Sequence, residues 1–402
     1  MSYLALYRKY RPKTFKEVYG QQAIVQTLTN QVKLDRIAHA YLFCGPRGTG
    51  KTSIAKIFAK AINCTNHQDG NPCLECQCCK NTAEGLNVDI IEIDAASNNG
   101  VDNIRELIEE SRYRPQYGKY KVYIIDEVHM LSNSAFNALL KTLEEPIGNS
   151  IFILATTEVH KVPATIFSRC QRYNFKLLSD EEIIQALNDI IVKEGYGYDD
   201  IKTLSYIAKL AKGGLRDAIS MLDQCLIYIS SKTLTLDDVK VIFGEIEEGT
   251  IVDIVDAINN SDVKKLFNII DDLEFNGKPL VNICKSWFEH FKNEYIFNPN
   301  IDGVIYKRYL EILAELSEKM KYNNNRAIFE IEMIHLCKPE MDTDYAALYQ
   351  RIAKLEEIIY QQSNNQITDS IESSINESEF ITLKFKPQYN IYTEVFYLNQ
   401  AE

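Results

Sequence analysis

The stretch Gly45-Pro-Arg-Gly-Thr-Gly-Lys-Thr52 decides the fold, because it fits the pattern G-x-x-x-x-G-K-[ST]. It follows an apolar run, Tyr41-Leu-Phe-Cys44, and precedes apolar residues at helical spacing, such as Ile54 and Phe58. A strand before and a helix after are the context in which this pattern marks a phosphate-binding loop. The alternative is a glycine-rich turn without a ligand. The residues expected to bind nucleotide are Gly45, Pro46, Arg47, Gly48, Thr49, Gly50, Lys51 and Thr52.

The residue types in this loop match the chemistry of a nucleoside triphosphate. Glycines let backbone N–H groups close around phosphates, and the following helix N-terminus favours negative charge. Lys51 is expected to reach the β- and γ-phosphates, and Thr52 to ligate Mg²⁺. The loop therefore predicts that ATP and Mg²⁺ bind together.

A second apolar run, Val122-Tyr-Ile-Ile125, ends in two adjacent acids. Acids at the carboxyl end of a central parallel strand lie beside the phosphate loop. Asp126 is expected to hold Mg²⁺ and Glu127 to polarise the attacking water, which is the pairing that hydrolysis needs. A solvated strand end is the alternative, and His129 is interpreted as structural.

Three further residues are candidates for roles in catalysis. Thr157 follows the strand Ile151-Phe-Ile-Leu154 and could orient the lytic water. Arg169, after a short helix, could neutralise charge on a γ-phosphate, although a surface arginine is the alternative. Arg216 follows Gly213-Gly214 at a helix start and could couple the nucleotide state to a domain angle.

The order of elements predicts an α/β domain followed by helical domains. Short apolar strands alternate with helices over residues 1–178, which is typical of a parallel sheet covered by helices. Ser179 and Glu182 form a capping-box pattern, so a purely helical domain is expected over 179–243. A third, helical domain is expected over 244–362. Residues 363–402 are expected to be a polar linker and a tail with a β-hairpin pattern.

Five cysteines lie close together within the first domain. The run Cys73-x-x-Cys76-x-x-Cys79, with Cys64, supplies four thiolates for a tetrahedral Zn²⁺. Cys78 could replace Cys79, and redox or iron–sulfur readings are the alternatives. The intervening residues are loop-like, and a small loop-rich insert needs a metal to fold. The isolated Cys44, Cys170, Cys225, Cys284 and Cys337 are expected to be core residues.

Charge and composition narrow the class of protein. The 402 residues carry a net charge of −12, but residues 1–60 hold 11 Lys or Arg against two acids. The first segment is therefore expected to face an anion, or else to be a solvated basic face. The sequence has neither a signal-peptide pattern nor an apolar run that could span a membrane. We expect a cytoplasmic protein with reduced cysteines.

Taken together, these residues resemble the gamma/tau subunits of the bacterial DNA polymerase III clamp loader, an AAA+ family. The resemblance is close over residues 1 to about 243. Besides the cysteine module it rests on Leu6-Tyr-Arg-Lys-Tyr-Arg-Pro12, Gly20-Gln21, His39-Ala-Tyr-Leu-Phe-Cys-Gly-Pro-Arg-Gly-Thr-Gly-Lys-Thr52, Glu92-Ile-Asp-Ala-Ala-Ser97, Asp126-Glu-Val-His129, Leu139-Leu-Lys-Thr-Leu-Glu-Glu-Pro146, Ala155-Thr-Thr157 and Ser168-Arg-Cys170.

The resemblance implies an AAA+ domain, a helical lid and a helical collar that assembles a pentameric ring with other clamp-loader subunits. It implies an ATPase that opens a sliding clamp and loads it onto primer-template DNA during replication. Arg169 would act on a neighbouring subunit's ATP, and Arg216 would sense nucleotide from the lid. The zinc ligands would be Cys64, Cys73, Cys76 and Cys79, and residues 7–20 would help to enclose the adenine.

Two departures from the family pattern limit these expectations. Some relatives carry basic residues after Ala-Ala-Ser, whereas here the turn is Asn98-Asn-Gly100, which leaves backbone amides and Arg105 to meet DNA phosphates. The family's longer form continues past the collar to bind polymerase and replicative helicase. This sequence stops at Glu402, and a short form, a truncated chain and a reduced version all remain open.

Three other classes of protein compete with this interpretation. Another AAA+ DNA-remodelling ATPase is disfavoured by the cysteine insert and by Ser168-Arg-Cys170. A non-hydrolysing clamp-loader subunit is disfavoured because Lys51 and the two acids are present. A zinc-based DNA-binding module with an incidental nucleotide fold is disfavoured by the acidic net charge.

Overall fold

The structure is a computed structural model that describes residues 3–359 apart from 147, 244–247, 300, 323–324, 344, 354 and 357–358. The chain divides into two compact units, Met1–Phe243 and Gly244–Glu402, and each is described by itself. The expected linker and hairpin over residues 363–402 lie outside the described residues. No helix in the described part of the chain combines the length and apolarity needed to cross a membrane.

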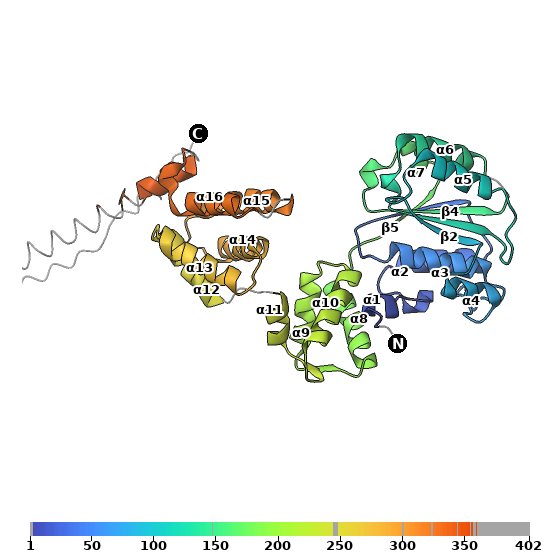
Figure 1. The fold of residues 1–402 in the computed structure, drawn as a ribbon, viewed down its shortest axis with the longest axis horizontal. Coiled ribbons are helices and arrows are strands. Elements are labelled where there is room, and N and C mark those ends of the chain that lie inside the picture. The colour runs from blue at the N-terminus through green and yellow to red at the C-terminus, as the bar shows by residue number, and fades with distance from the viewer. Residues whose placement is uncertain are drawn as a thin grey trace, which may run out of the picture. The chain divides into compact units, whose positions relative to one another are not determined.

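A five-stranded parallel sheet forms the centre of the first unit, in the order β2-β3-β4-β1-β5 (Figure 1). The three apolar runs expected to be strands, which begin at Tyr41, Val122 and Ile151, are confirmed as parts of β1, β3 and β4. The three middle strands are buried on both faces, which is why their sequences are apolar without alternation. The strands are β1 (Ala40–Cys44), β2 (Ile90–Asp94), β3 (Lys121–Asp126), β4 (Ser150–Thr156) and β5 (Gln171–Asn174).

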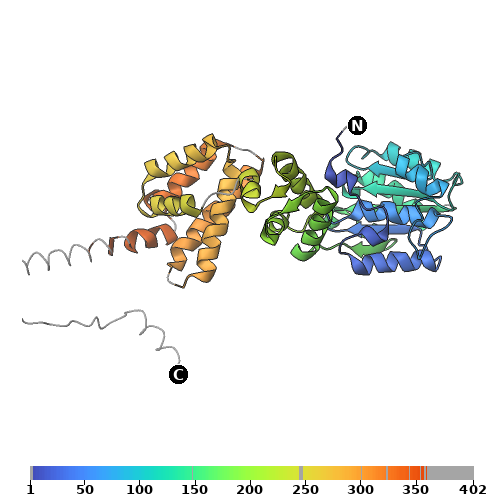
Figure 2. The same ribbon diagram turned by 90° about the horizontal axis from the view of Figure 1, so that it is seen from below.

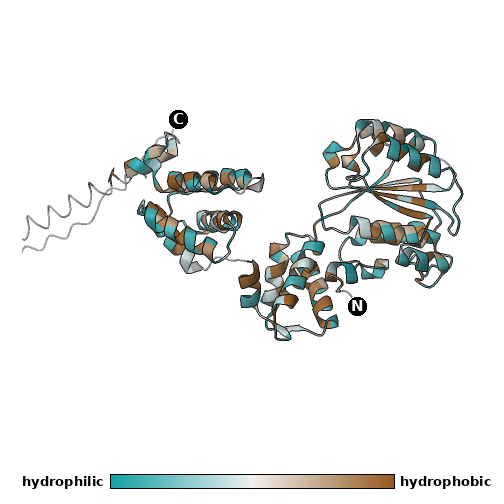
Figure 3. Ribbon diagram, in the orientation of Figure 1, coloured by the Kyte–Doolittle hydropathy of each residue, from teal (hydrophilic) through white to brown (hydrophobic). Residues whose placement is uncertain are grey.

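Helices cover both faces of this sheet and make three layers (Figure 1). One apolar cluster joins α2 and α3 to the sheet, and a second joins α5, α6 and α7 to the opposite face. The apolar strands between these layers are brown in Figure 3. The bounds are α2 (Gln22–Lys33), α3 (Lys51–Asn63), α4 (Gln77–Glu84), α5 (Val101–Glu110), α6 (Asn133–Glu144) and α7 (Ala164–Phe167), with single turns η1 (Phe15–Glu17), η2 (Val128–Met130) and η3 (Val159–Lys161).

The remainder of the first unit is a small helical lid. The expected capping box is confirmed, because Ser179 Oγ accepts from the Glu182 backbone N–H and Glu182 Oε2 accepts from the Ser179 N–H. The expectation of a purely helical segment is wrong in one detail, a two-residue parallel ladder between strands distant in sequence. The elements are α8 (Asp180–Lys193), β6 (Gly197–Tyr198), α9 (Ile201–Leu210), α10 (Leu215–Tyr228), β7 (Thr233–Leu234) and α11 (Leu236–Phe243), and α1 (Leu6–Lys9), from the start of the chain, packs against them.

The second unit is helical throughout its described residues (Figure 2). Its helices pack around a core that includes the fully buried Trp287 and Phe329. The elements are α12 (Glu248–Asn259), α13 (Val263–Phe275), α14 (Leu280–Phe297), α15 (Gly303–Tyr322), α16 (Arg326–Cys337) and the turn η4 (Pro339–Met341). Further helical residues follow at 345–353, 355–356 and 359.

Candidate nucleotide site and four-cysteine cluster

The phosphate loop connects β1 to α3, as the sequence predicted. Three of its glycines adopt backbone angles that other residues rarely tolerate, with φ of 152° at Gly45, 79° at Gly48 and 93° at Gly50. Gly45 has no room for a side chain, because a Cβ atom there would lie 2.5 Å from the Phe175 carbonyl oxygen. The loop leads directly into the N-terminus of a 13-residue helix, where backbone N–H groups favour an anion.

Lys51 is buried at the first position of α3, with 6% of its surface exposed. Its Nζ donates to the carbonyl oxygens of Gly45 and Pro46, each at 2.8 Å. Burial lowers the pKa of Lys51, while the carboxylates of Glu127 and Asp126 act in the opposite direction. The ammonium group is thus held within the loop, where it can exchange carbonyl partners for phosphate oxygens.

Thr52 and Asp126, expected to share a metal ion, lie in contact. Thr52 Oγ1 donates to Asp126 Oδ2 at 2.7 Å, and Asp126 Oδ1 accepts from the Glu127 N–H at 2.9 Å. A hydroxyl and a carboxylate are oxygen ligands of the kind that Mg²⁺ prefers. The pair fits a magnesium ion that would also be bound by nucleotide phosphates.

Glu127 lies at the carboxyl end of β3 in a left-handed backbone conformation, with φ of 47°. Its Oε2 accepts from Thr157 Oγ1 at 2.8 Å and from the Thr157 N–H at 3.3 Å. The structure thus brings together the two residues that the sequence placed beside the lytic water. Backbone strain tends to accumulate at active sites, so the left-handed conformation of Glu127 is consistent with its candidate role as a catalytic acid.

His129 belongs to this group, although sequence reasoning interpreted it as structural. Its Nδ1 lies 3.2 Å from Thr156 Oγ1 and 3.4 Å from Glu127 Oε2, and its Nε2 lies 3.2 Å from Glu158 Oε1. Lys161 is the main cause of a lowered pKa at Glu158, and His129 adds to the effect. The sequence signal that could have revealed these contacts is a histidine two residues after the candidate catalytic acid, Glu127.

Arg169 lies just beyond α7 and is not among the residues that converge at the phosphate loop. Its Nη1 donates to the Thr165 carbonyl and to Ser168 Oγ, each at 2.9 Å, and its Nη2 forms an ion pair with Glu144 at the end of α6. Sequence reasoning missed Glu144. The structure therefore places Arg169 on a different set of contacts from Lys51 and Asp126.

Arg216 lies in the first turn of α10, and its guanidinium carbon is 5.0 Å from the centroid of the Tyr7 ring. Arg8 is the main cause of a lowered pKa at Tyr7, and Arg216 contributes. The lid reaches the phosphate loop at this point, because a Cβ on Gly48 would lie 3.1 Å from Gly214 Cα. The expected position of Arg216 at a helix start is confirmed, whereas its contact with nucleotide stays a prediction.

The four cysteines expected to bind metal converge after α3. The sulfur atoms of Cys64, Cys73, Cys76 and Cys79 all lie within 4.8 Å of one another, and those of Cys64 and Cys76 are 4.0 Å apart. Zinc–sulfur bonds of 2.3 Å place tetrahedral sulfurs about 3.8 Å apart, so a small contraction would fit the cluster to Zn²⁺.

Cys78 is excluded from this cluster. Its buried sulfur accepts from Asn87 Nδ2 at 3.3 Å. Burial raises the pKa of the Cys78 thiol. The fourth sulfur that converges on the cluster is therefore that of Cys79 rather than Cys78, and zinc binding by these cysteines stays a prediction. Cys44, Cys225, Cys284 and Cys337 are buried, as expected, and Cys170 is partly buried.

The turn expected to meet DNA, Asn98-Asn-Gly100, precedes α5. The Asn98 N–H donates to the Asp94 carbonyl at 3.0 Å. Arg105 forms an ion pair with Asp102 at 3.2 Å. DNA binding at this turn stays a prediction.

The parallel sheet, the phosphate loop after β1, the acids after β3 and the helical lid define a P-loop ATPase of the AAA+ class. The chain is 38% identical to DNA polymerase III subunit tau of Bacillus subtilis, over 97% of this chain and 74% of that protein. It belongs to the gamma/tau family of DNA polymerase III subunits, the ATPase subunits of the clamp loader.

Other comparisons agree with this family. The chain is 43% identical to subunit gamma of Buchnera aphidicola subsp. Baizongia pistaciae, covering 69% of this chain and 75% of that one. It is 45% identical to subunit tau/gamma of Haemophilus influenzae, covering 67% of this chain and 39% of that one. The family model "DNA polymerase III, delta subunit" matches residues 20–179, and "DNA polymerase III clamp loader subunit, ATPase lid domain" matches 182–230.

Among solved structures, the Thermotoga maritima RuvB Holliday junction branch migration motor aligns with a TM-score of 0.46 at 17% identity. The alignment covers 62% of this chain and 79% of that one.

Proposed function

We propose that this chain binds and hydrolyses ATP in order to open a sliding clamp and load it onto primer-template DNA, within a pentameric ring of clamp-loader subunits. The observation that carries the proposal is the convergence of Lys51, Thr52, Asp126, Glu127 and Thr157 at one edge of the sheet. A subunit that only supported the ring would not need this hydrolytic set. Its place in DNA replication implies a cytoplasmic location.

In this proposal the loop Gly45–Thr52 holds the phosphates through backbone N–H groups and the Lys51 ammonium. Thr52 and Asp126 hold Mg²⁺, which neutralises charge on the phosphate oxygens when it is bound. Glu127 polarises the attacking water, and Thr157 keeps the Glu127 carboxylate in place.

Arg169 is proposed to act in trans on the ATP of an adjacent subunit. It contacts Glu144, Thr165 and Ser168, and none of these three residues belongs to the nucleotide site of its own chain. An arginine supplied in trans to the γ-phosphate in this way accelerates hydrolysis by about 10³-fold or more. The isolated chain is therefore expected to be a poor ATPase.

Arg216 is proposed to report the nucleotide state to the lid. Gly214 approaches Gly48 so closely that movement of α10 and movement of the phosphate loop are sterically linked. A guanidinium in the first turn of α10 is well placed to respond when phosphate charge appears in the loop.

The cysteine cluster is proposed to hold one structural Zn²⁺ through Cys64, Cys73, Cys76 and Cys79. Four-sulfur sites without an open position are typical of structural rather than catalytic zinc. The ion would fix the segment between α3 and α4.

The remaining assignments follow from family membership. Residues 1–178 are proposed as the AAA+ domain, 179–243 as the lid, 244–362 as the collar and 363–402 as a linker and tail. The collar would assemble the ring. The C-terminal part would be the place to look for contacts with polymerase or replicative helicase.

A mixing experiment tests the proposal. Arg169→Ala and Lys51→Ala subunits are each assembled with clamp and primed DNA, separately and together, and ATP turnover is measured with each component omitted in turn. Each variant alone should be near background, and the mixture should regain activity at interfaces that pair an intact Lys51 with an intact Arg169. Arg172→Ala, an exposed arginine of β5, is the matched control and should stay active. Absence of recovery in every mixture would assign Arg169 a role in its own chain.

A further inference from the structure

Both terminal nitrogens of the Arg169 guanidinium are held by other residues of the chain. Nη1 donates to the Thr165 carbonyl and to Ser168 Oγ, and Nη2 forms the ion pair with Glu144. Ser168 Oγ in turn donates to the Thr165 carbonyl at 3.0 Å, so the two acceptors of Nη1 are bonded to each other. Contacts at both nitrogens leave the long side chain little rotamer freedom.

The partners of Arg169 come from the ends of two helices that are fixed to the core. Glu144 is the last residue of α6, and Thr165 belongs to the short helix α7. Leu143 and Ile166, their neighbours in sequence, are both buried in the apolar cluster on this face of the sheet. Packed core residues therefore determine where the guanidinium lies.

Glu144 occupies a position where the helix itself disfavours an acid. The C-terminus of a helix carries partial negative charge, so a carboxylate there is unfavourable unless a cation offsets it. Helix α6 nevertheless ends with Glu144 and is followed by Glu145. Arg169 offsets the charge of Glu144, whereas no cation among the described residues pairs with Glu145. A residue that goes against a local preference in this way is expected at a functional site.

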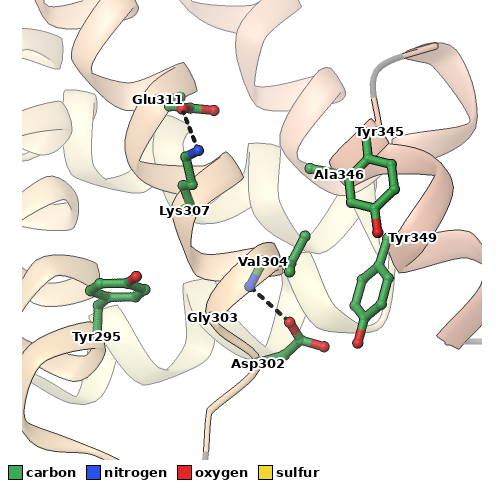
Figure 4. A pocket seen from close by; sticks show the side chains of 9 residues that line it. All are labelled: Tyr295, Asp302, Gly303, Val304, Lys307, Glu311, Tyr345, Ala346 and Tyr349. Carbon is green, nitrogen blue, oxygen red and sulfur yellow. Dashed lines mark hydrogen bonds and ion pairs between the residues drawn. The ribbon is translucent and has the colours of Figure 1, made fainter. Parts of the chain in front are cut away.

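A solvated ion pair in the second unit provides a contrast. Lys307 and Glu311 lie one turn apart on α15, beside an open hollow of about 760 Å³ (Figure 4). Their side chains are 69% and 63% exposed, and a pair of this kind contributes little to stability. The side chains of Arg169 and Glu144 are 31% and 49% exposed, and the pair links α6 to the residues that follow α7. The second pair therefore restrains a side chain between separate elements, which the first does not.

We propose that Glu144 is the positioning residue for Arg169, and that it holds the guanidinium ready for the γ-phosphate of an adjacent subunit. The inference rests on the proposed action of Arg169 in trans and adds the residue that fixes the arginine. A side chain that is already ordered loses less conformational entropy when it binds a phosphate. The three contacts described above occupy at most three of the five N–H donors, so at least two remain for phosphate oxygens.

ATP turnover of the assembled ring, with clamp and primed DNA, measures this role. Glu144→Ala should lower kcat by about tenfold and leave the KM for ATP within about twofold, because misplacing a group that acts in the transition state costs rate rather than substrate binding. Glu144→Gln should lose less, since its amide oxygen still accepts a hydrogen bond from Arg169. Glu145→Ala is the matched control, because Glu145 is the adjacent, exposed acid, and its kcat should equal that of the wild type.

Mixed assemblies separate positioning from a structural role. Glu144→Ala mixed with Lys51→Ala should turn over faster than the average of the two separate assemblies, since the Lys51→Ala chain supplies an intact Arg169 to its neighbour's ATP. Glu144→Ala mixed with Arg169→Ala should not exceed the average, because both chains lack a positioned arginine. A structural defect at the nucleotide site of the Glu144→Ala chain would give the opposite pattern in the two mixtures.

Three results would overturn the proposal. An unchanged or raised kcat in Glu144→Ala would show that the ion pair does not support catalysis. Recovery with Arg169→Ala but not with Lys51→Ala would connect Glu144 to the nucleotide site of its own chain. Loss of the ring in sedimentation velocity for both Glu144 variants would assign the residue to assembly.

The mixture of Arg169→Ala with Lys51→Ala distinguishes this inference from the function on which it rests. Absence of recovery there would overturn the action of Arg169 in trans, and the role of Glu144 with it. Recovery there, together with any of the three results above, would overturn the role of Glu144 alone.

Discussion

The phosphate site and the cysteine cluster lie at the two ends of one helix, yet the residues of each site are held in place by different interactions. Helix α3 begins at Lys51 and ends at Asn63, directly before Cys64. At its start, the polar side chains bond to one another and to the loop backbone over a large apolar core. At its end, the four sulfurs converge beside a short helix and a single β-bridge.

We infer that protein contacts alone hold the nucleotide site in place, whereas the proposed zinc site would depend on its metal ion. Lys51 donates to loop carbonyls and Glu127 accepts from Thr157, so protein contacts hold both side chains in place. The four cysteine sulfurs lie within 4.8 Å of one another, and each must lose its proton to bind a metal, so metal binding would be coupled to the folding of this segment. We therefore expect changes at the phosphate site to affect turnover and changes at the cysteines to affect folding.

The largest effect is expected from Lys51→Ala, which should lower ATP turnover of the assembled loader by about 10³-fold through loss of phosphate stabilisation. Circular dichroism and zinc content should not change. Lys60→Ala is a matched control, since Lys60 is a buried lysine of the same helix whose Nζ donates to the Lys13 carbonyl at 3.1 Å. Turnover retained in Lys51→Ala would remove the phosphate-loop assignment.

Next in size is Cys79→Ser, which should remove the metal and expose residues 64–85 to proteolysis. ATP affinity should change by no more than about twofold, because distant sites act nearly independently. Cys78→Ser should keep one zinc per chain, since Cys78 bonds to Asn87 rather than to the cluster. Metal analysis and limited proteolysis check both variants, and the reverse pattern would mean that the fourth ligand is Cys78.

A smaller change is expected from His129→Ala. Loss of the contacts with Glu127 and Thr156 should reduce kcat by about tenfold, as is usual for a residue that positions an acid–base group, with little change in KM for ATP. His160→Ala is the control, since His160 also faces Glu158, at 3.6 Å, but is exposed. Equal kinetics for the two variants would return His129 to a purely structural role.

The smallest effect is expected from Gly70→Ala, which tests how the cysteine segment packs on α2. A Cβ there would lie 2.6 Å from the Thr29 carbonyl, and φ is +77°. The loss of stability should be about 1–3 kcal/mol. Gly85→Ala shares the positive φ but meets nothing within 4 Å, so it should cost less in thermal unfolding. Equal costs would show that the segment does not pack on α2 as described.

Motifs formed by neighbouring residues could be predicted from the sequence. The phosphate loop, the acids after β3 and the cysteine spacing each depend on a few consecutive positions, and the structure places them as expected. Contacts between distant segments could not be predicted, because no local pattern encodes them. The Glu144–Arg169 ion pair, the Gly48–Gly214 approach and the β6–β7 ladder are of this kind.

The exposed apolar residues that follow α16, Tyr345, Leu348, Ile352 and Leu355, are an intermediate case. Their spacing of three and four residues is present in the sequence, but a stripe at that spacing is equally typical of a helix buried in its own domain. Only the burial of Ala347 and the bonds of Gln350 show which face is turned inward. The periodicity of the sequence predicts the helix, whereas the orientation of the helix depends on its packing contacts.

Because Gly214 lies close to Gly48, a small movement of the phosphate loop would rotate α10 about the Gly213–Gly214 joint. The helix has 14 residues. At 1.5 Å per residue it is about 21 Å long. A rotation of about 10° at the Gly213–Gly214 joint would displace its far end by about 4 Å, a geometric estimate from that length. Because no side chain separates the two glycines, even a small displacement of the loop is transmitted to the joint without being absorbed by rotamers. Substitutions that move α10 away from the loop should therefore reduce the displacement of the far end of the helix before they affect nucleotide affinity.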